Sequence, residues 1–361
     1  MTIRVFNPEH DLALASNLER FTSPHAGRQL RNDLSFLPGL WSESGDVVVV
    51  DDVDFAEASW RSLRKVRKEE VEFCTLSQLS HVIRQENVAS LSVDVWGWDA
   101  AIRFQLADAG VPETLLPAKE MLSEIRRLSS RQTTVPLLSC LRDGLKVNTC
   151  GRSMYVADKE MFKEILLKER NIVVKAPWSS SGRGIRYVMD GDVSVNTDNW
   201  IANTIRSQGG VMVEPLYNKV KDFAMEFVRD AAGDVRYVGL SLFETRNTSY
   251  TGNLLASEEE KRDILSCYLD LALVDEISSR LQRLLSLLLS PLSNLPLCLG
   301  VDMMVVADEN AGGFLLHPCV ELNLRRTMGH VALNLYTALL SPMSSMSAVF
   351  ENKRYRILVD N

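Results

Sequence analysis

The sequence lacks the cysteine and histidine spacings that are typical of small domains held together by disulfide bonds or by a bound metal. Its 361 residues include six cysteines without a C-x-x-C pair and five histidines without an H-x-x-x-H spacing. A chain of this length does not need a disulfide scaffold, and the cysteine spacing matches no zinc site. We expect reduced thiols, a cytoplasmic location and, from length alone, about two domains.

Long apolar runs and an excess of basic charge are also missing. The most apolar stretch, LQRLLSLLLSPLSNLPLCLG, is interrupted by Arg283 and two prolines, so it is too broken to span a bilayer. The N-terminal MTIRVFNPEHD carries charges where a signal peptide has an apolar core. The formal net charge of −7 argues against a nucleic-acid partner. We therefore expect neither a membrane nor nucleic acid as a partner.

A Gly-Lys dipeptide is absent, which excludes a Walker A loop. The stretch in question is NIVVKAPWSSSGRGIRYV, residues 171–188, where Lys175 precedes the glycines. A Rossmann fingerprint is excluded too, because Tyr187 stands where its third glycine would be. In protein kinases the glycine-rich loop comes before the lysine. What remains is strand, lysine, loop and strand, which alone fits a plain hairpin and a phosphate-covering loop equally well.

The first third of the chain predicts an α/β domain. Short β-branched runs at 3–6, 46–52 and 89–99 alternate with stretches of helical period at 23–40 and 100–112. This alternation favours a mostly parallel sheet, in which ligands bind beyond the carboxyl ends of the strands.

The rest of the chain predicts a helical connection followed by an α+β domain. The proposed division is 1–117, 118–150 and 151–361. VADKEMFKEILLKER is an amphipathic helix for which Asp158 is the expected N-cap. After the 171–188 stretch come a strand in GGVMVEPL, two strands around AAGD, a long helical stretch at 257–289, and a last hairpin.

That last hairpin carries side chains suited to a metal. If 308–313 is its turn, Asp302 faces Cys319 and shares a sheet face with Glu321 and Asn323. Asp302 is then a diagonal neighbour of Glu321, about 7–8 Å away. Two carboxylates among apolar neighbours are costly without a cation, so the pattern favours one or two Mg²⁺ over a solvated sheet face.

The order of these features resembles the ATP-grasp superfamily of ATP-dependent carboxylate–amine ligases and their relatives. The resemblance rests on Asp158-Lys159, on Lys175 before a Ser/Gly loop, on VMVEPL, and on Asp302 with ELNLRRTMG. It covers roughly residues 150–335, and the first third resembles the domain that usually precedes the grasp. The implied fold class is an α/β N-terminal domain plus an α+β ATP-grasp domain, with a lid lobe at about 151–214 and a metal-binding lobe at about 215–345.

The resemblance implies roles at a nucleotide site. Lys159 and Lys175 would hold the α- and β-phosphates, Glu214 would contact the adenine amine, and Asp222 would bind the ribose. The hinge would give backbone contacts to adenine from Pro215, Leu216 and Tyr217. The loop over the phosphates would be formed by Ser179, Ser180, Ser181, Gly182 and Gly184, with Arg183 at its tip.

The resemblance also implies a metal and a catalytic set. The metal ligands would be Asp302, Glu321 and Asn323, binding Mg²⁺ or, as an alternative, Mn²⁺. Arg325 or Arg326 would meet the γ-phosphate or an acyl phosphate, and Arg246 is a further candidate for the γ-phosphate. Leu324 replaces a proline usual in the family, which leaves open which arginine faces the phosphate.

The implied activity is ATP-dependent activation of a carboxylate as an acyl phosphate, followed by attack of an amine or similar nucleophile. A phosphotransferase on the same fold and a nucleotide-binding protein without turnover are the alternatives. Expected partners are ATP and small-molecule carboxylate and amine-type substrates; a homodimer is left open.

Several residues have two interpretations. Lys159 is otherwise a solvated helix charge, Glu214 a strand end, and His330 the start of a helix. Six residues that follow two strands of the first third either contact a substrate or form turns, a helix cap and core: Asn7, His10, Asp11, Trp96, Trp98 and Asp99.

Overall fold

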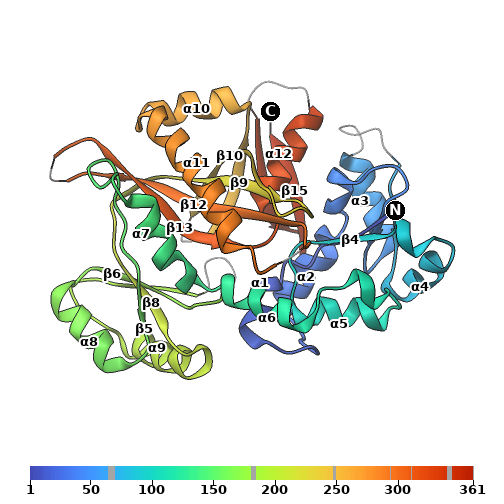
Figure 1. Cartoon of the computed structure of the whole chain (residues 1–361), viewed down its shortest axis with the longest axis horizontal. Coiled ribbons are helices and arrows are strands. Elements are labelled where there is room, and N and C mark those ends of the chain that lie inside the picture. The colour runs from blue at the N-terminus through green and yellow to red at the C-terminus, as the bar shows by residue number, and fades with distance from the viewer. Residues whose placement is uncertain are drawn as a thin grey trace.

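The computed structural model describes residues 1–63, 70–179, 184–246, 249–292, 294–309, 311–339 and 344–360. It contains two four-stranded sheets and one seven-stranded sheet (Figure 1). Among the described residues, no helix has both the length and the apolar composition that crossing a bilayer requires.

The N-terminal sheet is parallel, with strand order β3-β2-β1-β4. Its valine-rich strand β2 is buried along its whole length, as expected for a parallel sheet covered on both faces. The strands are β1 (Thr2–Val5), β2 (Val47–Val49), β3 (Glu72–Cys74) and β4 (Ser92–Val95). The helices are α1 (His10–Ser16), α2 (His25–Leu34), α3 (Val53–Leu63), α4 (Leu76–Arg84) and α5 (Ala100–Asp108). The α/β prediction is confirmed.

Two helices, α6 (Lys119–Leu128) and α7 (Thr134–Arg142), lead from this sheet to the second one. The second sheet is antiparallel, with the order β5-β8-β6-β7. Its strands are β5 (Met154–Val156), β6 (Ile172–Lys175), β7 (Ile185–Val188) and β8 (Val211–Pro215), and its helices are α8 (Lys159–Lys168) and α9 (Val195–Gln208). Asp158 caps α8 by accepting a hydrogen bond from the Met161 N–H, as predicted.

The seven-stranded sheet is antiparallel, with the order β13-β12-β9-β10-β11-β14-β15. Its strands are β9 (Lys219–Arg229), β10 (Val235–Arg246), β11 (Ser249–Leu255), β12 (Leu297–Ala307), β13 (Phe314–Asn323), β14 (Ser344–Glu351) and β15 (Arg354–Asp360). Its helices are α10 (Glu258–Ser266), α11 (Leu271–Leu288) and α12 (Met328–Leu339). The helical stretch expected over 257–289 is two helices, because Asp270 caps a second helix that begins at Leu271 by accepting from the Ala272 N–H.

Strand alternation separates apolar from polar residues on this sheet. Phe223, Met225 and Phe227 of β9 pack in one core with α11, whereas Asp222 and Glu226 lie on the other face. A second core joins the N-terminal sheet to α12, and includes Phe6, Leu37, Val331 and Leu335. The polar face of the large sheet is thus enclosed between the N-terminal sheet and the small sheet (Figure 1).

Candidate functional site

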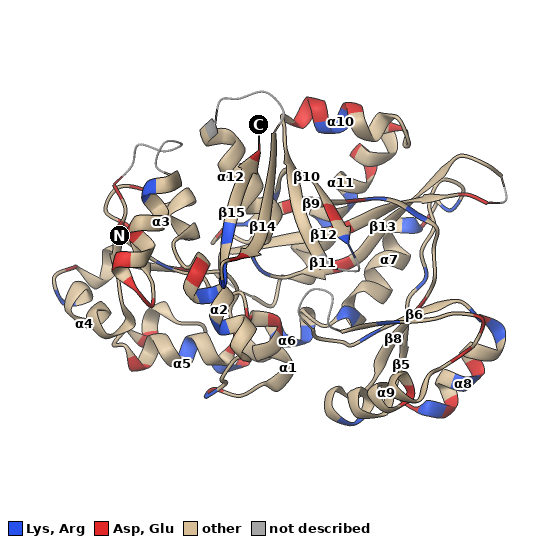
Figure 2. Cartoon of the chain, turned by 180° about the vertical axis from the view of Figure 1, so that it is seen from behind, with Lys and Arg blue, Asp and Glu red and all other residues tan. Residues whose placement is uncertain are grey.

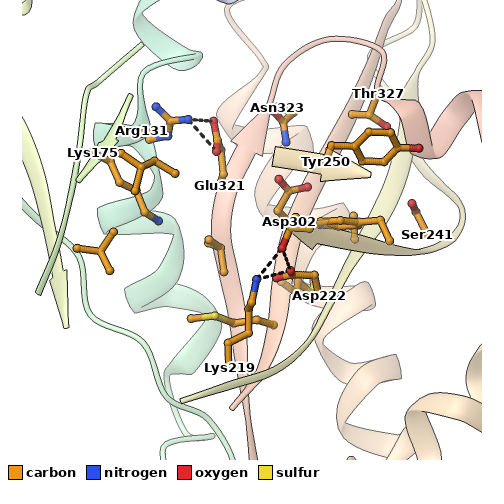
Figure 3. A pocket seen from close by; sticks show the side chains of 18 of the residues that line it. Arg131, Lys175, Lys219, Asp222, Ser241, Tyr250, Asp302, Glu321, Asn323 and Thr327 are labelled. Carbon is orange, nitrogen blue, oxygen red and sulfur yellow. Dashed lines mark hydrogen bonds and ion pairs between the residues drawn. The ribbon is translucent and has the colours of Figure 1, made fainter. Parts of the chain in front are cut away.

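A pocket of about 390 Å³ lies between the small and the large antiparallel sheets. The small sheet contributes Lys175 and Glu214, and the large sheet contributes Asp302 and Glu321. Figure 3 shows Lys175, Asp302 and Glu321 gathered from strands that are far apart in the sequence. The pocket holds most of the residues that the sequence singled out.

The β12–β13 hairpin brings the three predicted metal ligands to one face. Asp302 pairs directly with Glu321. Asn323, two residues after Glu321 on β13, pairs with Gly300, two residues before Asp302 on β12. All three side chains point into the pocket (Figure 3). The predicted facing of Asp302 and Cys319 is wrong, although the shared face is right.

The difference comes from a register shift between Asp302 and Met304. Met304 still pairs with His317, in the register set by the turn, but β13 then contains two extra residues. Pro318 lies in this bulge, and a proline has no N–H to donate to a strand ladder. Because the shift is two residues, the side chains keep their face while Asp302 moves opposite Glu321.

The electrostatics of this hairpin suit a cation. Burial, followed by the negative charges of Glu321 and Glu226, raises the pKa of Asp302 to about 8. Among the described residues no three His, Cys, Asp or Glu side chains gather closely enough to hold a metal. The set is instead two carboxylates and the Asn323 amide, all of them oxygen donors of the kind that Mg²⁺ prefers.

Lys175 and Glu214 form a buried ion pair in the wall of the pocket. Their Nζ–Oε2 distance is 2.6 Å, and both side chains are less than a tenth exposed. They lie on neighbouring strands, diagonally across the β6–β8 ladder. The Ser153 hydroxyl donates to the second oxygen of Glu214, at 3.1 Å. Lys175 thus presents a positive charge at the pocket without leaving a buried charge unpaired.

Arg131, between α6 and α7, is a pocket residue that the sequence did not reveal. It is 5% exposed, and its guanidinium donates to the Ala176 carbonyl and the Ser179 hydroxyl, both at 2.7 Å. The same group pairs with Glu321 at 2.8 Å (Figure 3). No local motif marks it, because its partners lie 45 to 190 residues away.

Sequence comparison finds no matching protein-family model and no matching curated protein. The fold, however, is similar to solved structures. A biotin carboxylase–β,γ-ATP complex from Campylobacter jejuni matches with a TM-score of 0.50 and 13% identity, over 96% of this chain and 75% of that chain. The chain has the ATP-grasp fold.

Two other solved structures show weaker likenesses. An ADP complex of N5-carboxyaminoimidazole ribonucleotide synthetase matches with a TM-score of 0.49 and 13% identity, over 97% of this chain and 81% of that chain. The N5-carboxyaminoimidazole synthetase of Staphylococcus aureus, also with ADP, matches with a TM-score of 0.44 and 10% identity, over 98% and 83%.

The segment predicted to be the hinge, 215–217, forms one wall of the pocket together with its neighbours. Asp222 lines it and is held by Lys219 and by the Thr245 hydroxyl at 2.8 Å. Leu216 lines it too, but its N–H donates to the Asn171 carbonyl at 3.0 Å. A backbone contact from Leu216 to a base would therefore use its carbonyl. The nucleotide roles of Glu214, Leu216 and Asp222 stay predictions.

The two arginines after β13 diverge. Arg325 lines the pocket and holds Asp11, with an Nη2–Oδ2 distance of 2.9 Å. Arg326 turns toward the N-terminal sheet, pairs with Asp94 at 3.0 Å, and stacks over Trp41. Of the two, Arg325 is therefore the one that faces the ATP-grasp pocket.

Two predicted residues do not reach the pocket. Helix α8 carries both signs of charge (Figure 2). Lys159 begins this helix and pairs with Asp198 at 2.6 Å. Arg246 is exposed at the end of β10. Neither is among the residues that line the pocket.

The predicted phosphate-covering loop is described only at its ends. Ser179 lines the pocket, and the Gly184 carbonyl accepts a hydrogen bond from the Ala176 N–H at 2.8 Å. A side chain at Gly184 would overlap that of Ser179, so this end of the loop is closely packed. The remaining loop positions, Ser180, Ser181, Gly182 and Arg183, lie outside the described residues.

The open residues of the N-terminal sheet form a polar cluster and a core. Asp99 caps α5 through the N–H groups of Ala101 and Ile102, and it binds His10 at 2.9 Å. Asn7 donates to the Gly97 carbonyl at 2.8 Å. Trp96 and Trp98 are buried in the two cores. Turn, cap and core therefore account for these residues, while Asp11 reaches the pocket through Arg325.

Proposed function

We propose that this ATP-grasp chain is an ATP-dependent ligase that activates a substrate carboxylate as an acyl phosphate for attack by an amine-type nucleophile. One observation carries the proposal. A single pocket brings the cationic side chains of Lys175 and Arg131 together with three oxygen donors: Asp302, Glu321 and Asn323. The similar biotin carboxylase structure is an ATP complex, which supports ATP as the occupant of this pocket.

The chain's residues supply binding and charge at this site. Lys175 and Arg131 would contact phosphate oxygens, Lys175 as a point charge and Arg131 as a fork. Asp302, Glu321 and Asn323 would hold Mg²⁺, or Mn²⁺, against those oxygens. The metal would neutralise charge on the transferring phosphoryl group. Arg325, held by Asp11, faces the same space and would orient an anionic oxygen there.

The proposed chemistry has two steps. A carboxylate oxygen attacks the γ-phosphorus, and the bond to ADP breaks. An unprotonated amine nitrogen then attacks the acyl carbon. The C–N bond forms, inorganic phosphate leaves, and the nitrogen releases a proton to solvent. The enclosed pocket would strengthen these electrostatic interactions by excluding water.

The test uses the full chain with Mg·ATP and a panel of carboxylates in which both carboxylate oxygens are ¹⁸O. With an amine or hydroxylamine as acceptor, we expect ADP, and inorganic phosphate that carries one ¹⁸O from the carboxylate. A phosphotransferase would instead give a phosphorylated product and no labelled phosphate. Nucleotide binding without ADP formation across the panel would favour a protein without turnover.

The metal assignment is tested with Glu321→Gln. We expect activity to fall at least about a hundredfold, as for the loss of an electrostatic contact that stabilises a transition state. Glu57→Gln is the matched control, because it removes the same charge from an exposed ion pair on α3. Full activity of Glu321→Gln would contradict the assignment.

A further inference from the structure

A buried carboxylate lies at the end of the pocket away from Arg131 and Lys175. Glu226, on β9, is 1% exposed and lines the pocket. It pairs with Gly300 of β12, two residues before Asp302, so both carboxylates lie on one sheet face. Its charge is also among the causes that raise the pKa of Asp302.

One oxygen of this carboxylate lacks a hydrogen-bond donor within the described part of the chain. It is Glu226 Oε2, which is fully buried. His330 Nδ1 lies 3.1 Å from it, but that nitrogen accepts from the Thr327 N–H at 3.2 Å. The other ring nitrogen faces the Phe227 carbonyl at 3.1 Å, and it must donate there. In this tautomer His330 gives Glu226 no proton, although a buried carboxylate needs a donor or a cation.

Two glycines pack directly against the carboxylate. A Cβ at Gly300 would lie 2.6 Å from Glu226 Oε2. One at Gly329, in the first turn of α12, would overlap Oε1 and lie 2.6 Å from the Ser241 hydroxyl oxygen. Glycine backbone therefore lies next to Glu226, and the Ser241 hydroxyl, which accepts from the Asn253 amide at 2.7 Å, is a polar neighbour besides His330.

The cations of the pocket are elsewhere. Figure 3 shows Arg131 and Lys175 on one side of Asp302 and Glu321, with Ser241, Tyr250 and Thr327 on the other. Arg325 is taken by Asp11. Lys261 donates to the Leu240 carbonyl at 2.9 Å and forms no ion pair with Glu226 among the described residues. The donor that Glu226 lacks can thus come from a ligand.

We propose that Glu226 and Ser241 form a subsite that binds the incoming amine as a primary ammonium group, which gives up a proton to solvent before its nitrogen attacks. This inference rests on the proposed function. It places ATP at the Lys175 end of the pocket, the metal ligands in the middle, and the amine at the Glu226 end. An ammonium group matches the site in charge, and its N–H groups fit one unpartnered carboxylate and one hydroxyl oxygen.

The test measures binding to the full chain saturated with Mg·ADP, by saturation-transfer NMR. The probes are methylammonium, ethanolammonium, glycinamide and the common amino acids, with tetramethylammonium and ethylene glycol as probes without N–H groups. We expect one or more primary ammonium probes to bind, and Glu226→Gln to weaken that binding about tenfold or more, as for the loss of a charge-assisted hydrogen bond. Mg·ADP should still bind Glu226→Gln, and its affinity should be unchanged in the control Glu57→Gln.

Two further variants keep the test decisive. Gly329→Ala, which puts a methyl group into the subsite, should abolish probe binding and leave Mg·ADP binding intact. Glu226→Asp, which keeps the charge, should bind with intermediate affinity, and it replaces Glu226→Gln if that variant does not fold. Equal amine affinity in wild type and Glu226→Gln, or no primary ammonium binding while Mg·ADP binds normally, would overturn the proposal. Failure of Mg·ADP to bind would instead contradict the proposed function.

Discussion

At the residue scale, Arg131 links two parts of the site. One guanidinium holds the Ser179 end of the loop after β6 and the Glu321 end of the β12–β13 hairpin. The planar fork of arginine can make both contacts at once, which a lysine point charge cannot do with the same geometry. The position therefore depends on the shape of the side chain as well as on its charge.

Replacing Arg131 with methionine should weaken Mg·ADP binding about tenfold or more, because a charge-assisted contact to phosphate is lost. Arg131→Lys should give an intermediate affinity, since it keeps the charge and loses the fork. Isothermal titration at saturating Mg²⁺ measures both. Arg61→Met, in an exposed ion pair, is the control. Wild-type affinity in Arg131→Met would show that this residue serves only the fold.

His317 predicts a pH dependence of stability. Burial, and then the positive charges of Lys175 and Arg142, lower its pKa from an ordinary 6.5 to about 3. Between these values the unfolded chain binds a proton that the folded chain does not. The His317 contribution to the free energy of unfolding is therefore complete above about pH 6.5 and is lost as the pH falls toward 3.

In His317→Leu this loss should disappear. The free energy of unfolding should fall less steeply from pH 6 to 4, by about 1 kcal/mol per pH unit relative to wild type. Urea unfolding at a series of pH values measures the slope. His81→Leu removes an exposed histidine and should keep the wild-type slope. An unchanged slope in His317→Leu would mean that His317 is protonated equally in both states.

At the element scale, local patterns predicted elements and missed register. The Asp158 cap and the strand–loop–strand around Lys175 follow from local sequence, and both are present. The hairpin register failed at Pro318, where a bulge changes pairing without changing the face. The β14–β15 hairpin was not predicted, because its turn at Asn352-Lys353 places a non-glycine residue at positive φ and lacks the usual Asn-Gly signal.

The candidate site likewise contains residues that local sequence patterns predicted and residues that they missed. Asp302, Glu321 and Asn323 are close in one hairpin, so alternation alone brings them together. Arg131 and Glu226 enter the pocket through tertiary packing, and no sequence spacing encodes that. Lys159 illustrates the converse, since its place in the family order did not bring it to the pocket. The domain limits at 117 and 150 stay proposals.

At the scale of the whole molecule, Asp94 joins the N-terminal sheet to the chain segment that follows the β12–β13 hairpin. It accepts from Arg4 within its own sheet, from the Trp41 indole at 3.1 Å, and from Arg326 at 3.0 Å. Arg326 also donates its backbone N–H to the Trp96 carbonyl at 2.8 Å. The residue next to Arg325 thus anchors the ATP-grasp sheet to the first domain.

Arg326→Met should lower the free energy of unfolding by about 1–3 kcal/mol, the cost of a lost charged hydrogen bond at a partly buried acceptor. The loss stays in that range because Asp94 keeps Arg4 and Trp41. Urea unfolding measures it, with Arg262→Met, in a more exposed ion pair, as the control. Equal stability of Arg326→Met and wild type would show that the apolar contact alone holds the two parts together.

The double engagement of Arg131 has a thermodynamic consequence. A ligand that breaks the ion pair between Arg131 and Glu321 also changes the hydrogen bond from Arg131 to Ser179. Conversely, a ligand that replaces Arg131 at Ser179 also changes the charge partner of Glu321. Occupancy of the hairpin and occupancy of the loop are therefore linked by one shared free energy, and each must alter the affinity of the other by the same factor.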